Sequence, residues 1–305
     1  MNINIKNINI NINININKKM PLLKIQNISY LSILKPLSFE IKSGEIMGII
    51  GANGAGKTTL LKRILGLLKN KNSNDNANNN EQIFIKNDNA KNSANYINFD
   101  DLSAIEIAKK ISYLPQKNDC FWNISVEEVI KLGLLPYKNF YSNNFFTNSA
   151  FNNDFQAKLN SILDATNLTN LRQKSINELS GGEQIRVHIA RSLIAEPNIL
   201  IADEPFANLD LYQQQQVIKL FKNYIQSQKK YNKSRGILIS IHDLLLAAQF
   251  CDRLLLLKSG ELISFDIPKK VLTAENLQLA FNIKVKQIQL DNPPFYISFN
   301  DNFVD

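Results

Sequence analysis

Residues 51–58 read Gly-Ala-Asn-Gly-Ala-Gly-Lys-Thr and directly follow a short apolar stretch, residues 45–50, Glu-Ile-Met-Gly-Ile-Ile. The spacing is that of the G-x-x-x-x-G-K-[ST] phosphate loop, with a strand expected before it and a helix after it. Its glycines allow the backbone to turn so that successive N–H groups converge on a phosphate chain. The helix that begins near Lys57 adds the positive end of its dipole. A glycine-rich turn that happens to precede Lys-Thr is the alternative, but the flanking elements favour a nucleotide site.

The side chains at the end of this loop indicate how a nucleotide would be held. Lys57 directs a positive charge toward the outer phosphates, and the Thr58 hydroxyl is a ligand that Mg²⁺ accepts. The residues expected at the nucleotide are Gly51, Ala52, Asn53, Gly54, Ala55, Gly56, Lys57, Thr58 and Thr59.

A second element with charged groups follows residues 199–202, Ile-Leu-Ile-Ala, which end in Asp203 and Glu204. A continuous apolar run is typical of a strand that is covered on both faces. Two carboxylates at its end require a cationic partner. We expect Asp203 to hold Mg²⁺, directly or through water, with Thr58 on its other side. We interpret Glu204, on the opposite side of the strand end, as the acceptor of a proton from the attacking water. A solvated acidic turn is the alternative.

Composition is that of a soluble globular protein. The chain has 305 residues, of which 44% are hydrophobic and 20% charged. No apolar run reaches the ~18 residues that cross a bilayer. The net charge of +8 comes from lysines among asparagines rather than from an arginine-rich stripe, so no nucleic-acid partner is expected. Cys120 and Cys251 lie far apart without metal-ligand spacing, which favours free thiols in a reducing compartment.

Two segments are dominated by asparagine. Residues 1–19 alternate Asn and Ile, and we expect a disordered or weakly β-prone, low-complexity extension, with Met20 as an alternative start. Residues 69–100 are expected to form an exposed insertion with one short strand, residues 82–86. The main domain is then 20–305.

Strands alternate with helices along the rest of the chain, which predicts a mainly parallel sheet with helices on both faces. Expected strands are 22–28, 37–41, 45–50, 82–86, 110–114, 198–202 and 236–241, with a hairpin over 253–257 and 261–265. Expected helices are 58–68, one from Ser125, 153–167, one after Gly182, 211–228 and 243–250.

Residues 179–183, Leu-Ser-Gly-Gly-Glu, precede an apolar-faced helix. Ser180 and Glu183 form a capping box, and the glycines leave backbone N–H groups open. A helix N-terminus is an anion site, although its own neighbours supply no anion. A well-capped helix without a ligand is the alternative.

The order of these motifs resembles that of the ABC ATPase family, whose LSGG signature lies between the phosphate loop and the acidic strand. Gln116 in Tyr-Leu-Pro-Gln matches the Q-loop, Asp210 in Asn-Leu-Asp the D-loop, and His242 the switch histidine. The resemblance covers about residues 21–298. It implies an α/β P-loop NTPase of ABC type, with a RecA-like core, an antiparallel β subdomain and a helical subdomain inserted at about 117–190.

The resemblance also implies a head-to-tail homodimer that binds ATP and Mg²⁺. Each ATP would lie between the Lys57 loop of one subunit and Ser180, Gly181 and Gly182 of the other, near Asp210. Gln116 would contact Mg²⁺ or the attacking water. His242 would hydrogen-bond the γ-phosphate, although a lone histidine is more often structural. Tyr30 is the candidate that stacks on adenine, with ordinary packing as its alternative.

Residues 122–133, 242–253 and 271–277 look like the corresponding stretches of importer ATPases for iron chelates, haem and cobalamin. This branch implies two integral membrane permease subunits as partners, and a substrate-binding protein that acts with them without touching this chain. It also implies a peripheral location at the cytoplasmic face of the inner membrane. Residues 117–122 and the helix from Ser125 would line the permease groove. The alternatives are a metal-ion importer or exporter, a soluble ABC protein that acts on DNA, ribosomes or cluster assembly, and an inactive regulatory homologue.

Overall fold

The computed structural model describes residues 21–68, 81–87, 96–116, 123–137, 149–227, 233–283, 285–288 and 296–299. The expected disordered extension 1–19, residues 117–122 and Cys120 lie outside this range.

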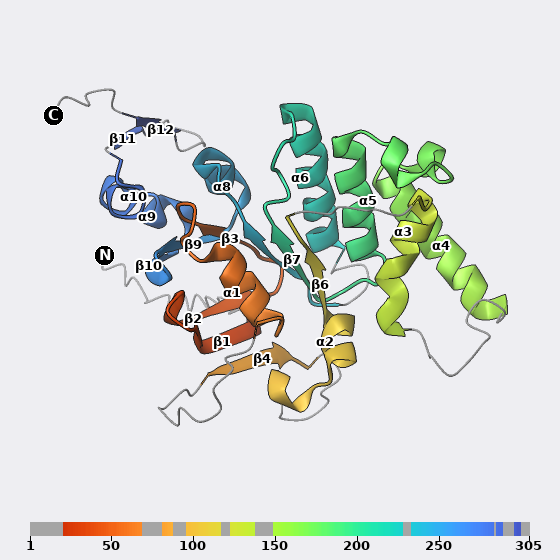
Figure 1. The fold of residues 1–305 in the computed structure, drawn as a ribbon, viewed down its shortest axis with the longest axis horizontal. Coiled ribbons are helices and arrows are strands. Elements are labelled where there is room, and N and C mark those ends of the chain that lie inside the picture. Colours follow the sequence, from red (N-terminus) through yellow and green to blue (C-terminus); the bar gives the residue numbers. More distant parts are fainter. Residues whose placement is uncertain are drawn as a thin grey trace, which may run out of the picture.

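A six-stranded sheet forms the centre of the molecule (Figure 1). Its strands, in order, are β10 (Glu261–Asp266), β9 (Arg253–Lys258), β3 (Ile46–Ile50), β8 (Gly236–Ser240), β7 (Ile199–Asp203) and β6 (Ile111–Leu114). All neighbouring pairs are parallel except β9 with β10. Strands β3, β7 and β8 are buried along their whole length, as their apolar runs predict. The expected mainly parallel sheet is confirmed.

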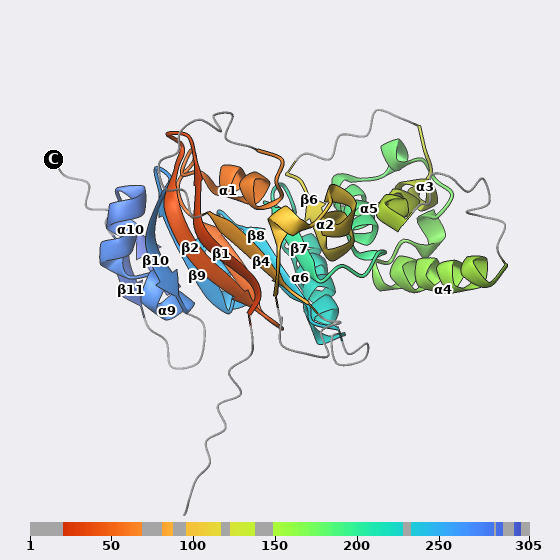
Figure 2. The same cartoon turned by 90° about the horizontal axis from the view of Figure 1, so that it is seen from below.

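A second, antiparallel sheet covers one face of this core. Its strands, in order, are β2 (Leu34–Lys42), β1 (Pro21–Tyr30), β4 (Gln82–Lys86) and β5 (Tyr96–Asn98). Leu23 and Ile25 of this sheet share one hydrophobic cluster with Ile49 of the central sheet and with Leu60 of the helix after it. Figure 2 shows the two sheets packed in layers. The antiparallel subdomain therefore packs against the phosphate loop and the helix that follows it.

Helices surround the central sheet and extend beyond one of its edges. They are α1 (Lys57–Ile64), α2 (Ala104–Lys110), α3 (Val126–Lys131), α4 (Ser149–Ala165), α5 (Gly181–Leu193), α6 (Leu211–Gln226), α8 (Leu244–Phe250), α9 (Pro268–Val271) and α10 (Ala274–Phe281). Short 3₁₀ turns are η1 (Phe99–Asp101), η2 (Leu132–Tyr137), η3 (Thr169–Leu171) and η4 (Ile176–Glu178), and β11 (Val285–Ile288) pairs with β12 (Tyr296–Phe299). Helices α3, α4 and α5 lie at one end of the molecule, and α9 and α10 at the other (Figures 1 and 2).

Two hydrophobic clusters account for this helical packing. Phe206, Phe221 and Phe250 meet edge-on or stacked in the cluster beneath α6 and α8. Val129 of α3 and Leu159 of α4 belong to a separate cluster, together with residues of α5. Because α5 contributes to both clusters, it joins the outlying helices to the sheet.

The structure differs from the sequence-based expectations at several element ends. Helix α1 stops at Ile64 instead of residue 68, because Gly66 has a φ of 70° and turns the chain. The expected insertion contributes a second strand, β5, and helix α2 follows it. Residue Arg63 holds this region together: it donates to the Ser29 and Leu68 carbonyls and pairs with Glu81 over 2.7 Å.

No helix within the described residues is long and apolar enough to cross a bilayer. Cys251 is a buried free thiol, as expected, and burial raises its pKa.

Candidate nucleotide site

The loop between β3 and α1 has the backbone geometry that its glycines predict. Gly51, Gly54 and Gly56 have φ values of 154°, 78° and 98°, a region that side-chain-bearing residues seldom adopt. A Cβ at Gly51 would lie 2.4 Å from the Leu257 carbonyl oxygen. Gly56 caps α1 without any side-chain hydrogen bond, and the first turn of α1 holds no acidic residue. The N–H groups at this helix end are therefore available to an anion.

Lys57 lies inside this loop and is almost completely buried. Its Nζ donates to the Gly51 oxygen over 2.8 Å and to the Ala52 oxygen over 3.2 Å. Burial lowers the pKa of Lys57, while the nearby carboxylates of Glu204 and Asp203 oppose this shift. The ammonium group is thus positioned between the loop and the acidic strand end.

Asp203 ends β7 and has only 1% of its surface exposed. Its Oδ1 accepts a hydrogen bond from Ser240 Oγ over 2.6 Å, whereas its buried Oδ2 makes no hydrogen bond to the protein. The Tyr113 hydroxyl lies beside the same carboxylate: burial, followed by the negative charge of Asp203 and a hydrogen bond to it, raises the pKa of Tyr113 to about 12. A buried carboxylate oxygen without a donor is the group that a bound cation would satisfy.

The residues fit magnesium at this position. Asp203 Oδ2 and the half-buried Thr58 hydroxyl are hard oxygen ligands. Within the described part of the chain, no cluster of three His, Cys, Asp or Glu side chains offers a complete metal cage. Magnesium commonly takes one or two protein oxygens and completes its shell with phosphate and water. The sparse donor set is therefore suited to a metal that arrives with a nucleotide.

Glu204 follows Asp203 and meets two of the other residues singled out from the sequence. Gln116 Nε2 donates to Glu204 Oε2 over 2.5 Å, and His242 Nε2 is hydrogen-bonded to Glu204 Oε1. Glu204 has a φ of 51°, a left-handed conformation that costs an L-residue about 1–2 kcal/mol. The turn aims the carboxylate away from Asp203 and toward the ends of β6 and β8. Three motifs far apart in sequence thus meet at one carboxylate.

The second expected anion site is the N-terminus of α5. Ser180 and Glu183 form the capping box that the sequence predicts. Gly181 is open, since a Cβ there would meet nothing within 4 Å, whereas a Cβ at Gly182 would lie 2.3 Å from Gln213 Nε2. Gln213 completes a capping box with Asp210 at the start of α6. Gly182 is therefore packed against the first turn of α6, which Asp210 caps.

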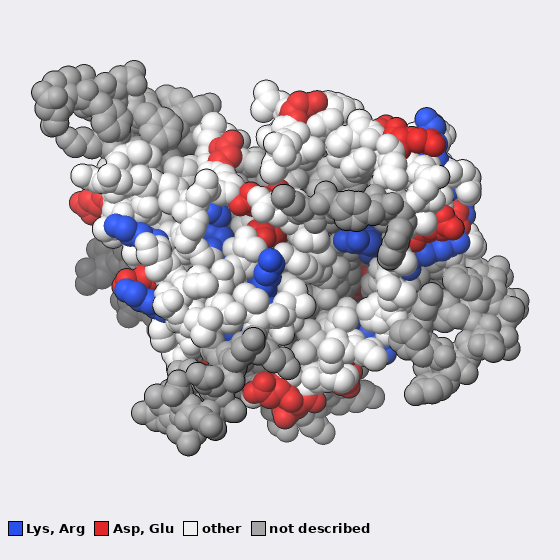
Figure 3. Space-filling model, in the orientation of Figure 1, with Lys and Arg blue, Asp and Glu red and all other residues white. Residues whose placement is uncertain are grey.

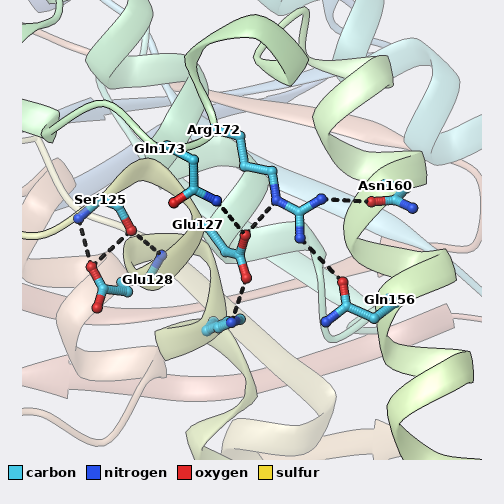
Figure 4. Close-up of polar contacts among 8 residues, drawn as sticks. Ser125, Glu127, Glu128, Gln156, Asn160, Arg172 and Gln173 are labelled. Atoms are coloured by element: carbon cyan, nitrogen blue, oxygen red, sulfur yellow. Dashed lines mark hydrogen bonds and ion pairs between the residues drawn. The ribbon is translucent and has the colours of Figure 1, made fainter.

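A network of polar side chains anchors the segment that leads to Ser180 (Figure 4). Glu127 of α3 accepts hydrogen bonds from Arg172 Nε and Gln173, and it pairs with Lys131 over 2.5 Å. Arg172 also donates to Asn160 and Gln156 of α4, over 3.1 Å in each case. The Arg172 hydrogen bond, followed by those of Lys131, lowers the pKa of Glu127 despite burial. No motif in the sequence indicates this network, because its members lie on three separate segments.

Tyr30 is the last residue of β1, and its expected contact with adenine stays a prediction. Its partly buried ring packs against the cluster of the antiparallel sheet. The turn that follows carries Leu31 and Ile33, whose exposed fractions are 67% and 45%. The Ile33 carbonyl lies 3.6 Å from the place of a Cβ at Gly56. The sequence analysis did not single out these apolar side chains beside the phosphate loop. Their position in a turn between two strands was the feature of the sequence that could have indicated their exposure.

The parallel sheet and the phosphate loop at the end of β3 define the class: this is a P-loop NTPase. Residues 34–207 match the model of the family described as ABC transporter. The chain belongs to this family, binds nucleotide and is an ATPase of ABC type.

Curated relatives extend over most of the chain. An uncharacterised ABC transporter ATP-binding protein of Methanocaldococcus jannaschii is 34% identical over 82% of this chain and 86% of its own length. The petrobactin import ATP-binding protein of Bacillus anthracis is 31% identical over 86% of each chain. The hemin import ATP-binding protein of Deinococcus radiodurans is 29% identical over 91% of this chain and 97% of its own.

Solved structures support the same fold. The ADP conformation of an ATP-binding cassette of an ABC transporter superposes with a TM-score of 0.66 at 22% identity, covering 86% of this chain and 99% of that one. A subunit of a Clostridium perfringens ABC transporter complex gives a TM-score of 0.62 at 25% identity, covering 86% and 96%.

Proposed function

We propose that this chain is the ATP-hydrolysing subunit of an importer for a metal chelate, such as a ferric siderophore, haem or cobalamin. One observation supports ATP hydrolysis: Gln116 and His242 both bind the Glu204 carboxylate, which lies close enough to Lys57 to affect its pKa. The import of petrobactin and hemin by the relatives named above supports the choice of substrate class.

The chain would work as a head-to-tail homodimer. The open N-terminus of α1 cradles the phosphates of ATP in one subunit, and the exposed Ser180 and Gly181 of the other subunit face the same phosphates. Gly182 and Asp210 shape this second surface through Gln213. Two helix N-termini would then bind one polyphosphate, whose negative charge each of them favours.

The protein side chains have distinct tasks in this proposal. Lys57 exchanges its loop carbonyls for phosphate oxygens, and Glu204 accepts a proton from the water that attacks the γ-phosphate. His242 orients that water and the γ-phosphate. Gln116 relays the nucleotide state of the site to the membrane partner. Asp203 and Thr58 would hold Mg²⁺, which when bound offsets phosphate charge.

Partner subunits in the membrane would couple ATP hydrolysis to transport. We place their contact beside α3 and residues 117–122. Support comes from α2 and η2, which touch each other and expose Ile105, Leu132, Leu135 and Tyr137. Monomeric proteins seldom leave such side chains grouped without a partner. Two permease subunits, peripheral attachment at the cytoplasmic face and an indirect link to a substrate-binding protein complete the proposal.

Surface charge does not favour nucleic acid as the partner. On the face in Figure 3, Lys and Arg side chains are interspersed with Asp and Glu and form no continuous stripe. A stripe of that kind is the usual footprint of a nucleic-acid-binding surface.

Co-purification and uptake test this function. The tagged full chain should recover hydrophobic permease subunits from membranes, and a strain that lacks it should lose uptake of labelled haem, ferric siderophore or cobalamin. Reconstituted permease should raise the ATPase rate above that of the isolated chain. Recovery of ribosomes or cluster-assembly scaffolds instead, with uptake of all three ligands intact, would contradict the proposal.

A further inference from the structure

Ser240 is the last residue of β8 and has no exposed surface. Its hydroxyl donates to Asp203 Oδ1 over 2.6 Å and accepts from the Glu204 backbone N–H over 2.9 Å. The parallel register between β7 and β8, which pairs Asp203 with Ser240, brings the hydroxyl to both residues. One small side chain therefore contacts the two acidic residues of the site.

The first contact selects the orientation of the Asp203 carboxylate. Because Oδ1 is bound to Ser240, Oδ2 is the oxygen left without a protein donor, and it is fully buried. A carboxylate that is free to rotate would present either oxygen. Hydrogen bonds from neighbouring groups orient metal ligands in this way and commonly change metal affinity by about 10–100-fold.

The second contact holds the turn of the chain at Glu204. This residue has a φ of 51°, which a non-glycine residue keeps only when its surroundings hold it. The hydrogen bond to Ser240 fixes the Glu204 amide, and the turn directs the carboxylate to Gln116 and His242.

We infer that Ser240 is a positioning residue for ATP hydrolysis: its hydroxyl turns Asp203 Oδ2 toward the metal of the nucleotide and keeps Glu204 aimed at the attacking water. This inference rests on the proposed hydrolytic function, and it assigns a role to a residue outside the nucleotide-contacting loops. Ser240 would act through its hydrogen bonds to Asp203 and Glu204.

Three variants of the full chain separate this role from simple packing. Ser240→Ala removes the hydroxyl, and Ser240→Thr keeps it. Ser192→Ala is the matched control, because Ser192 is also buried and donates to a backbone carbonyl, that of His188, over 2.9 Å. Thermal unfolding of each variant records the structural cost of the substitution.

The decisive readout is the affinity for Mn²⁺, which substitutes for magnesium. Electron paramagnetic resonance measures this affinity in the presence of a non-hydrolysable ATP analogue. Ser240→Ala should weaken Mn²⁺ binding about tenfold. Its affinity for the analogue without metal should stay within about twofold of wild type, and its kcat should fall while KM for ATP is unchanged. Ser240→Thr should restore metal affinity and kcat, and Ser192→Ala should match wild type in both.

The inference would be overturned if Ser240→Ala bound Mn²⁺ like wild type, or if it lost only as much thermal stability as Ser192→Ala while keeping its kcat. Should Ser240→Ala fail to fold, a weak Mn²⁺ affinity in a folded Ser240→Thr protein would equally overturn it. ATP hydrolysis by the wild-type chain tests the proposed function separately, whatever the Ser240 variants do.

Discussion

The Gln116 side-chain amide lies 2.5 Å from Glu204 Oε2, and the two residues are 88 positions apart in the chain. His242 holds the other oxygen of the same carboxylate. Both oxygens are thus bound to side chains that come from the ends of different strands. A water molecule that delivers a proton to Glu204 must share or displace one of these contacts, so any movement of Gln116 alters the base directly.

Replacement of Glu204 by glutamine tests this carboxylate. An amide is close to the same size and keeps a hydrogen-bonding oxygen, but it does not accept a proton. We expect ATP binding to be retained, phosphate release to fall by about 10²–10⁴-fold, and a stable dimer to accumulate with ATP. Nucleotide titration, phosphate release and size-exclusion chromatography measure the three effects. Rapid turnover would exclude Glu204 as the base.

Lys57→Ala addresses the phosphate loop. Its ammonium group bonds only to the Gly51 and Ala52 carbonyls among the described contacts, so the fold should survive its loss. We expect ATP affinity to drop below detection in a fluorescence titration. Lys62→Ala, on the same helix but partly exposed, should bind ATP like wild type. Equal affinity in the two variants would mean that the loop does not hold the phosphates.

Gly182 and Gly181 should differ in their tolerance of a methyl group. Alanine at position 182 pushes the Gln213 side chain aside and breaks its bond from the Asp210 N–H, which is 3.2 Å long. We expect a loss of about 1 kcal/mol in the free energy of unfolding for Gly182→Ala, and none for Gly181→Ala. The double variant with Gln213→Ala should lose less than the sum of the single losses. Urea unfolding measures all of these, and equal stabilities of the two alanine variants would refute the contact.

The pH dependence of stability should expose the Glu127 network. Hydrogen bonds from Arg172 lower the pKa of Glu127, so the stabilisation is fully present above the unfolded-state pKa of about 4.3 and is lost as the pH falls through the folded-state value. Arg172→Gln should therefore cost about 2 kcal/mol at pH 7, and this cost should shrink as the pH falls through the lowered pKa of Glu127. A cost that stays the same across this range, measured by urea unfolding, would show that charge plays no part. Glu127→Gln should mimic the low-pH behaviour at pH 7.

Much of the site could be predicted from sequence because each motif is short and contiguous. The loop around Lys57, the acidic pair at Asp203 and the capped helix at Ser180 are specified by neighbours within a few residues. Their meeting depends on the parallel arrangement of the strands, which the alternation of strands and helices predicted, and on the strand order, which it did not predict.

Other features depend on contacts that no local pattern encodes. Ser240 looks like an ordinary serine at the end of an apolar strand until the register with Asp203 is known. Arg172 reaches Glu127 across 45 residues. Strand β5 and helix α2 went unrecognised because asparagine-rich composition masks the weak strand and helix patterns beside it. The adenine contact of Tyr30 stays a prediction.

Arg63 has a practical consequence for work with this protein. One guanidinium contacts both the Leu68 carbonyl and the Glu81 carboxylate, so these two residues, 13 positions apart in the chain, lie close together. When the two ends of a segment are held close together, a change in the length of the segment alters the entropy of loop closure only slightly. Epitope tags or fluorophore-binding peptides spliced between these two residues should therefore leave the catalytic core intact, which offers a reporter position remote from either terminus.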